Sequence, residues 1–165
     1  MLLGTITSNA YRIVLALHIL TAIVGFGSVL LNGVYAGKAR ARGGPEGGAI
    51  AQANYEVSFG WSIWFIYAVI ILGLALVGMS DKLIKFGQTW VWLSIVLYLA
   101  IIGIVHGVHR PNVRRLNELM GQGTAADREE MERRGRLAEA MGAVMTVLVV
   151  VVVFLMVMKP GGPKF

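Results

Sequence analysis

The chain has 165 residues, of which 56% are hydrophobic and only 15% are charged, whereas an average soluble domain has about 25% charged residues. A water-soluble core of this size cannot bury so much apolar surface, so the composition excludes an ordinary soluble domain. The formal net charge is +6, but the basic residues lie in short segments between apolar runs, which is typical of a membrane protein and not of a nucleic-acid-binding protein. Without cysteine, the chain has no disulfide and no cysteine nucleophile.

Four apolar stretches predict membrane-spanning helices, at about residues 11–35, 57–79, 90–109 and 138–158. Each is close to the roughly 20 residues that cross a hydrocarbon layer of about 30 Å, where only a helix satisfies its own backbone. The first stretch has no basic n-region and no clear cleavage site, so we expect it to stay in the mature protein. The predicted fold is all-α, a single polytopic membrane domain built as a four-helix bundle.

The connections between the predicted spans differ in character. Residues 37–48 are rich in glycine and predict a flexible connector. Residues 112–136 predict a cytoplasmic helical hairpin between the third and fourth spans, with a turn at residues 121–123 and a restart at a capping box of Thr124 and Asp127. Its charges of both signs are typical of a solvated helix with i,i+4 ion pairs. A docking surface for a partner or for anionic lipid is the alternative.

The distribution of lysine and arginine predicts the orientation. Ten of the fifteen lie in the first and third connections, and five lie near the N-terminus, in the second connection and in the C-terminal tail. The positive-inside rule therefore places these two connections in the bacterial cytoplasm and both termini outside. At that cytoplasmic interface we expect the polar tips of His106 and His109 beside Arg110, Arg114 and Arg115, whose charges favour lipid headgroups.

His18 is the only ionisable side chain well inside a span, so we expect it to face the bundle interior. One interpretation is a neutral imidazole that is hydrogen-bonded to a neighbouring helix. The other is a haem ligand, a metal ligand or a proton-handling group, since imidazole is a common ligand for iron and copper. At about the same depth the third span offers Ser94 and Tyr98, which share one helix face and are candidates to contact the imidazole or a cofactor.

Small and polar residues predict where helices pack closely. In the first span they form a stripe that includes His18, Gly25, Ser28 and Asn32, whereas the opposite face, with Ile19, Ile23, Phe26 and Leu30, is expected to contact lipid. Two further candidates for contacts between helices, or between protomers, are the pairs Gly33 with Gly37 and Gly103 with Gly107.

Residues 16–40, ALHILTAIVGFGSVLLNGVYAGKAR, resemble the first helix of a loose bacterial superfamily. It includes copper-resistance-D-like proteins, the haem-containing protoporphyrinogen oxidase and a family of predicted inner-membrane proteins of unknown function. The matching motifs are Leu17-His18 and His106-Gly107 followed by Arg110. The resemblance implies the four-helix fold and a haem-type cavity around His18. It does not imply oxidase activity, because the third span lacks the lysine that works with the first-helix histidine in that enzyme.

Three functions are compatible with the sequence. The first is a non-catalytic accessory or assembly subunit that contacts the lipid bilayer and either other membrane subunits or its own copies. This hypothesis is favoured by the absence of acidic residues from the uncharged interior of the spans, which in the fourth span begins at residue 140, and by the absence of the HExxH, GxSxG and Walker motifs. The second is a redox protein that binds haem b through His18. The third is a permease for a small solute or a metal ion, argued from the polar stripe of the first span.

Overall fold

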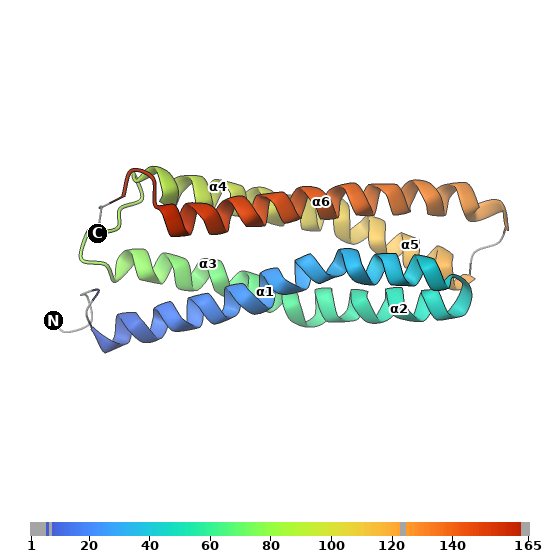
Figure 1. Ribbon diagram of the computed structural model, residues 1–165, viewed down its shortest axis with the longest axis horizontal. Coiled ribbons are helices and arrows are strands. Elements are labelled where there is room, and N and C mark those ends of the chain that lie inside the picture. The colour runs from blue at the N-terminus through green and yellow to red at the C-terminus, as the bar shows by residue number, and fades with distance from the viewer. Residues whose placement is uncertain (1–5, 7, 123–124, 163–165) are drawn as a thin grey trace.

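The computed structural model describes residues 6, 8–122 and 125–162, and these form helices joined by short turns, with no strand among them (Figure 1). The predicted all-α class is confirmed. In chain order the elements are α1 (Asn9–Arg42), α2 (Gly44–Glu56), the π-helical η1 (Val57–Ser62), α3 (Ile63–Gly78), α4 (Thr89–Ile104), the π-helical η2 (Val105–His109), α5 (Arg110–Gln122), the 3₁₀ turn η3 (Ala125–Asp127) and α6 (Arg128–Met158).

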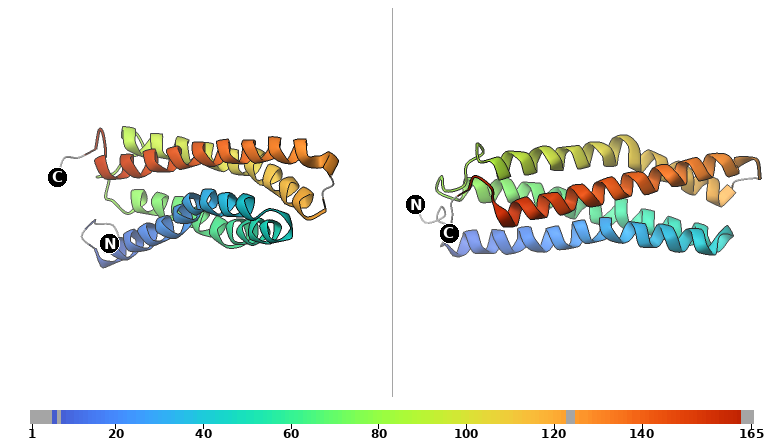
Figure 2. Two further views of the ribbon diagram at one scale, coloured as in Figure 1. Left: turned by 45° about the vertical axis from the view of Figure 1, so that its right-hand side comes forward. Right: turned by 45° about the horizontal axis from the view of Figure 1, so that its top comes forward.

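These elements form four long rods, because α2, η1 and α3 run on as one helix and α4, η2 and α5 as another. All four rods are long and apolar enough to cross a membrane, which confirms the predicted number of spanning helices. They pair as two antiparallel hairpins, α1 with the second rod and the third rod with α6, as two further views also show (Figure 2). The first and last described residues therefore lie at one end of the bundle, and the turn at Gly43 lies at the other.

The prediction of a flexible connector at residues 37–48 is wrong. Helix α1 continues to Arg42 and α2 begins at Gly44, so Gly43 alone connects them. Gly43 and Gly44 have φ angles of 62° and 50°, which glycine adopts without a steric penalty. A Cβ atom on Gly47 would lie 2.3 Å from the carbonyl oxygen of Ala39. The glycines of this segment therefore permit a tight turn between two helices that touch.

Exposed apolar side chains mark a belt around the bundle. At the end that carries Gly43, the last large hydrophobic side chains exposed on the four rods are Tyr35, Val57, Val108 and Leu137. Residues 36–56 and 110–136 expose no large hydrophobic side chain within the described part of the chain. This pattern is expected where a helix leaves lipid and enters water. We call residues 36–56 and 110–136 the head.

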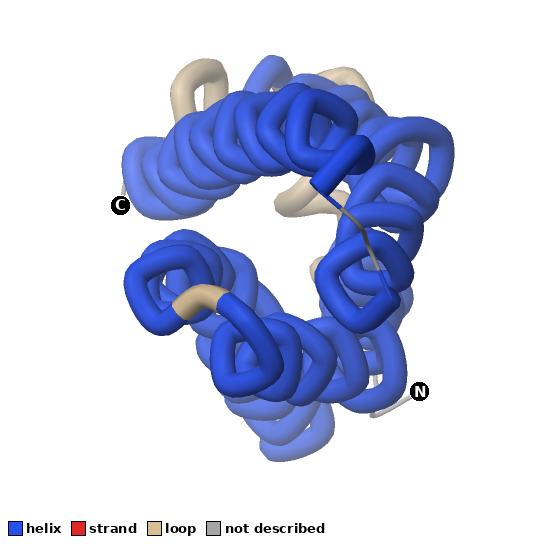
Figure 3. Tube along the Cα trace, turned by 90° about the vertical axis from the view of Figure 1, so that its right-hand side faces the viewer, coloured by secondary structure: helices blue, strands red, loops and turns tan. Residues whose placement is uncertain are grey.

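The head exists because the helices are longer than a bilayer is thick. Helix α1 has 34 residues, about 51 Å at 1.5 Å per residue, against a hydrocarbon thickness of about 30 Å. Helices α2 and α5 have 13 residues each and extend the head by roughly 20 Å. They pack against each other, and α5 packs against α6. Figure 3 looks along the four rods from the head end.

The core inside the belt forms where the two hairpins meet. Phe26, Ile66, Tyr98, Ile101 and Met145 belong to one buried cluster contributed by all four rods. Only 6% of Phe26 is exposed, so the prediction that it faces lipid is wrong. The predicted lipid-facing side chains on its two sides, Ile23 and Leu30, are exposed. The buried face of α1 is thus wider than the stripe of small and polar residues, because it also includes the ring of Phe26 next to Gly25.

Gly25 allows the closest approach of α1 to α3. A Cβ atom there would lie 3.1 Å from Cγ1 and 3.2 Å from the backbone nitrogen of Ile66, whereas a Cβ atom on Gly27 would meet nothing within 4 Å. Overfilling a packed site costs about 1–3 kcal/mol. We therefore expect Gly25→Leu to lower the midpoint of thermal unfolding in detergent by several degrees and Gly27→Leu to leave it near the wild-type value. Equal midpoints for the two variants would contradict this helix contact.

Candidate functional site

A chamber of about 850 Å³ lies between the two hairpins, at the end of the belt and within the head. Each of α1, α2, α5 and α6 contributes one helix face to it. On α6 the lining residues form one broad helix face, and they are Met131, Glu132, Gly135, Arg136, Ala138, Glu139, Gly142, Ala143, Met145 and Thr146. Gly135 and Gly142 leave space where larger side chains would fill it, since a Cβ atom on either would meet nothing within 4 Å.

His109 is the buried polar group of the chamber wall. Only 9% of the surface of His109 is exposed, and its Nδ1 atom is buried without a hydrogen-bond partner in the described part of the chain. Burying an unpaired polar atom costs free energy, so such an atom calls for an explanation. His109, which was predicted to present a polar tip at the interface, has its side chain buried in the chamber wall. The ring of His106, by contrast, is exposed and its Nε2 pairs with the Tyr67 hydroxyl at 2.6 Å.

Two π-helical segments place aromatic side chains beside this histidine. Phe59 lies in η1, and His109 is the last residue of η2. Their ring centroids are 6.4 Å apart, and the Tyr55 ring lies 4.8 Å from Phe59. A π-turn holds an extra residue, so it rotates the side chains that follow relative to a regular helix. The guanidinium carbon of Arg110, which was predicted at the lipid interface, lies 5.5 Å from the Phe59 centroid.

Neutral and charged polar groups occupy different parts of the chamber. Deep in the wall, the Ser58 hydroxyl donates to Oδ1 of Asn32 at 2.9 Å, which joins the second rod to α1. At the rim, Arg40 of α1 pairs with Glu139 of α6 at 2.5 Å. Arg136 and Glu132 pair along α6 at 3.6 Å. These rim pairs are half exposed or more, so each adds little to stability. They nevertheless pair both arginines that line the chamber with a carboxylate.

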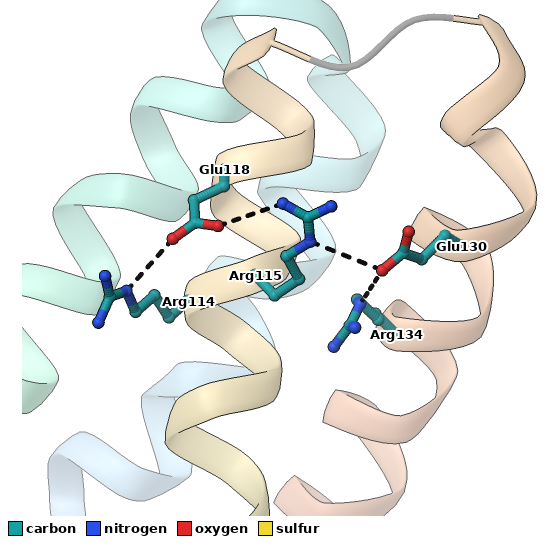
Figure 4. A network of polar contacts seen from close by, with 5 residues as sticks. All are labelled: Arg114, Arg115, Glu118, Glu130 and Arg134. Atoms are coloured by element: carbon teal, nitrogen blue, oxygen red, sulfur yellow. Dashed lines mark hydrogen bonds and ion pairs between the residues drawn. The ribbon is translucent and has the colours of Figure 1, made fainter.

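The outer side of the head carries a connected set of ion pairs between α5 and α6. Figure 4 shows Arg115 between Glu118 of its own helix, at 3.4 Å, and Glu130 of α6, at 3.6 Å. Arg134 also contacts Glu130, at 2.7 Å. Arg114, like Arg115, was predicted to meet lipid headgroups, and it pairs with Glu118 at 3.2 Å. The i,i+4 ion pairs predicted for this segment are therefore present.

Buried amides also fix α5 in place. Asn112 is buried, donates to the backbone carbonyl of Arg134 at 2.8 Å and accepts from the guanidinium of the same residue at 3.4 Å. Asn117 donates to the carbonyl of Ala51 in α2 at 3.4 Å. The predicted capping box cannot be assessed in full, because Thr124 lies outside the described residues. The helix before it runs to Gln122, which lies within the predicted turn at residues 121–123.

The residues predicted to surround a haem have other contacts. Nδ1 of His18 lies 2.9 Å from the carbonyl of Val69, which makes it the donor, and Cε1 lies 3.2 Å from the Cβ position of Gly73. The Tyr98 hydroxyl donates to the carbonyl of Ile66. Ser94 is buried, and its Oγ has no partner among the described residues. None of the three predicted residues lines the chamber, and haem binding at His18 stays a prediction.

The predicted helix-packing residues separate into two groups. Gly25 meets Ile66, Ser28 donates to the carbonyl of Gly25 at 2.7 Å, and Asn32 accepts from Ser58. At Gly33, Gly37, Gly103 and Gly107 a Cβ atom would meet nothing within 4 Å. Close contacts at these four glycines stay predictions for an assembly with other chains.

The chamber itself was missed from the sequence, although a signal for it exists. Residues 132–146 repeat small or polar residues at helical spacing, as the first span does, but the charged surroundings favoured a solvated hairpin. The burial of His109 has no such signal, because it depends on the π-turn that precedes it.

Four long apolar rods with an exposed apolar belt define a polytopic helical membrane protein. A family model described as a predicted integral membrane protein (DUF2269) matches residues 12–160, so the chain belongs to this family. No curated protein and no solved structure matches the chain. The relation to copper-resistance-D-like proteins and to the protoporphyrinogen oxidase stays an expectation from the sequence.

The ion pairs of the head predict a dependence on pH. A hydrogen bond from Arg134, followed by the charges of Arg134 and Arg115, lowers the pKa of Glu130. A lowered folded-state pKa contributes stability above the pKa of the unfolded chain, and this contribution is lost as the pH falls through the folded value. We expect amides at the α5–α6 contact to lose protection from hydrogen exchange, corrected for intrinsic rates, between pH 6 and pH 3.

Replacing Glu130 should remove its share of this pH effect. We expect Glu130→Gln to show lower protection at pH 6 and a smaller change on acidification than the wild type, whereas Glu129→Gln on the same turn should behave as the wild type does. A Glu130→Gln variant with the full wild-type change would contradict the role of this carboxylate.

Proposed function

We propose that this protein is a non-catalytic accessory protein of the bacterial cytoplasmic membrane that holds a small amphiphilic molecule in its chamber. The observation that carries the proposal is the chamber of about 850 Å³ with the buried, unpaired Nδ1 of His109 in its wall. Sites for small molecules have volumes of roughly 300–1,000 Å³ and combine a mostly apolar lining with a few polar groups that orient the ligand.

The position of the chamber suits a ligand that is taken from the membrane. Asn32, Ser58 and His109 lie near the end of the apolar belt, and Arg40, which pairs with Glu139, lies farther out in the head. Apolar side chains, among them Val29 and Leu116, complete the lining. A molecule with a hydrocarbon part and a polar part therefore finds matching surfaces on the two sides of the belt boundary.

The distribution of charge supports a cytoplasmic location for the head. Ten of the fifteen lysine and arginine residues lie in it, and short segments with this excess remain inside during insertion. In this orientation both termini lie outside, and a ligand held in the chamber is accessible from the cytoplasmic leaflet.

Binding is favoured over catalysis by the polar contacts of the wall. The Ser58 hydroxyl donates to an amide oxygen and not to a base, whereas a catalytic hydroxyl is activated by an adjacent base. The cations at the rim are paired with carboxylates. These contacts give the chamber a defined shape and groups that can form hydrogen bonds with a ligand. A carrier, a sensor or an assembly subunit needs such a binding site and no catalytic group.

The proposal predicts where a lipophilic probe becomes attached. A long-chain alcohol that carries a photoactivatable diazirine, added to the purified protein in lipid nanodiscs, should label residues 29–40 of α1 and residues 131–146 of α6. Gly142→Phe places a ring on the chamber face of α6 and should reduce this labelling at least about fivefold, because the probe and the ring compete for one space. Mass spectrometry of the labelled peptides measures the effect.

The control is Gly103→Phe, at an exposed glycine outside the chamber whose Cβ position is also open. It should leave the labelling of the chamber unchanged. Labelling confined to the exposed belt, or equal labelling of the chamber in both variants, would show that the chamber does not hold the probe.

A further inference from the structure

We propose that the ligand of the chamber is an uncharged lipophilic ring compound with a ring carbonyl or hydroxyl, the chemistry that membrane quinones and quinols share, and that this group binds Nδ1 of His109. The inference rests on the proposed function of the chamber and adds the chemical class of its ligand. It follows from three observations, namely the charges, the aromatic rings and the unpaired nitrogen of the wall.

The charges of the chamber favour a neutral ligand. Its two lining arginines, Arg40 and Arg136, each form an ion pair with a lining glutamate. A carboxylate or phosphate headgroup would have to displace these glutamates or lie beside them without a cation of its own. Burial of an unpaired anion is far more costly than burial of a neutral carbonyl. Fatty acids and phospholipid headgroups therefore match the wall less well than a neutral group does.

The aromatic side chains favour a flat ring. Tyr55, Phe59 and His109 all line the chamber and follow one another with centroid separations of 4.8 Å and 6.4 Å. Neighbouring rings in this row are tilted against each other by 46° and 41°. Aromatic rings associate in offset or edge-to-face arrangements at such distances. A planar ligand ring can extend this row, whereas a simple alkyl chain gains only apolar contact.

The unpaired nitrogen selects a hydrogen-bonding group on that ring. Nδ1 of His109 is buried and has no partner among the described residues, and His109 is one of the residues that line the cavity. Rotation of the imidazole about its Cβ–Cγ bond turns this nitrogen toward a ligand in the cavity. In one tautomer Nδ1 donates to a carbonyl, and in the other it accepts from a hydroxyl. A quinone and its quinol can therefore each form a hydrogen bond with this nitrogen, whereas an alkylbenzene cannot bond with either tautomer.

The test is competition against the photoactivatable alcohol on the full chain in nanodiscs. Decylubiquinone and its reduced quinol are the ring probes, decylbenzene is the ring without oxygen, and decanoic acid is the anionic chain. We expect decylubiquinone, the quinol or both to displace the alcohol at concentrations about tenfold lower than decylbenzene, as one additional hydrogen bond to a buried group can provide. Comparison of the two ring probes identifies the redox form that is held.

Two substitutions test His109 itself. His109→Leu should raise the concentration of ring probe needed for half displacement about tenfold and leave that of decylbenzene unchanged. His109→Asn, whose amide lies near the position of Nδ1, should recover most of the affinity. If the leucine variant does not fold, the comparison of the ring probes with decylbenzene on the unsubstituted protein still tests the ligand class.

The outcomes separate this inference from the proposed function. If the alcohol labels the chamber but the ring probes displace it no better than decylbenzene, the ligand class is wrong and the chamber remains a binding site. Stronger displacement by decanoic acid would also overturn the neutral ring compound. If the alcohol does not label the chamber at all, the proposed function fails first.

Discussion

The head is held in shape by the tight turn at Gly43. Because a single residue joins α1 to α2, the two helices must run side by side from the turn back to the belt. Gly47 allows this contact, since any side chain there would collide with the backbone of Ala39. The second hairpin then packs on the first through α5, with Asn117 bonded to the backbone of α2. A flexible connector at Gly43 would leave α2 free, and the chamber would lose one of its four walls.

The chamber arises because the helices are held together by their core but carry small residues above it. In the belt, Phe26, Ile66 and Tyr98 fill the space between the hairpins. Toward the head several of the facing residues are glycine or alanine, among them Gly135 and Ala143. The ion pairs at the rim and between α5 and α6 link the helices around this space. Packing in the belt and charge in the head therefore make a cavity together.

Hydropathy alone predicts the number of spanning helices, because lipid imposes length and helical structure on every span. Lipid offers no hydrogen-bond partner, which also explains why His18 donates a hydrogen bond to the carbonyl of Val69 on the neighbouring helix. The connector at Gly43 could not be predicted, since glycine-rich segments are typical of both loops and tight turns. The burial of His109 and of Phe26 depends on how two helices rotate against each other, which includes the π-turns at η1 and η2. Hydropathy and the spacing of small residues do not show how far each helix is rotated about its axis.

A cysteine scan through α2 tests whether the helices continue beyond the membrane as a folded head around the chamber. The chain has no cysteine of its own, so each variant of residues 48–56 carries one reactive thiol for a water-soluble maleimide in nanodiscs. A folded head predicts labelling that follows the helical period, fast at the exposed Gln52 and Glu56 and slow at Ala51 and Asn54. Uniformly fast labelling throughout residues 48–56 would show that α2 is a flexible connector and would contradict the folded head.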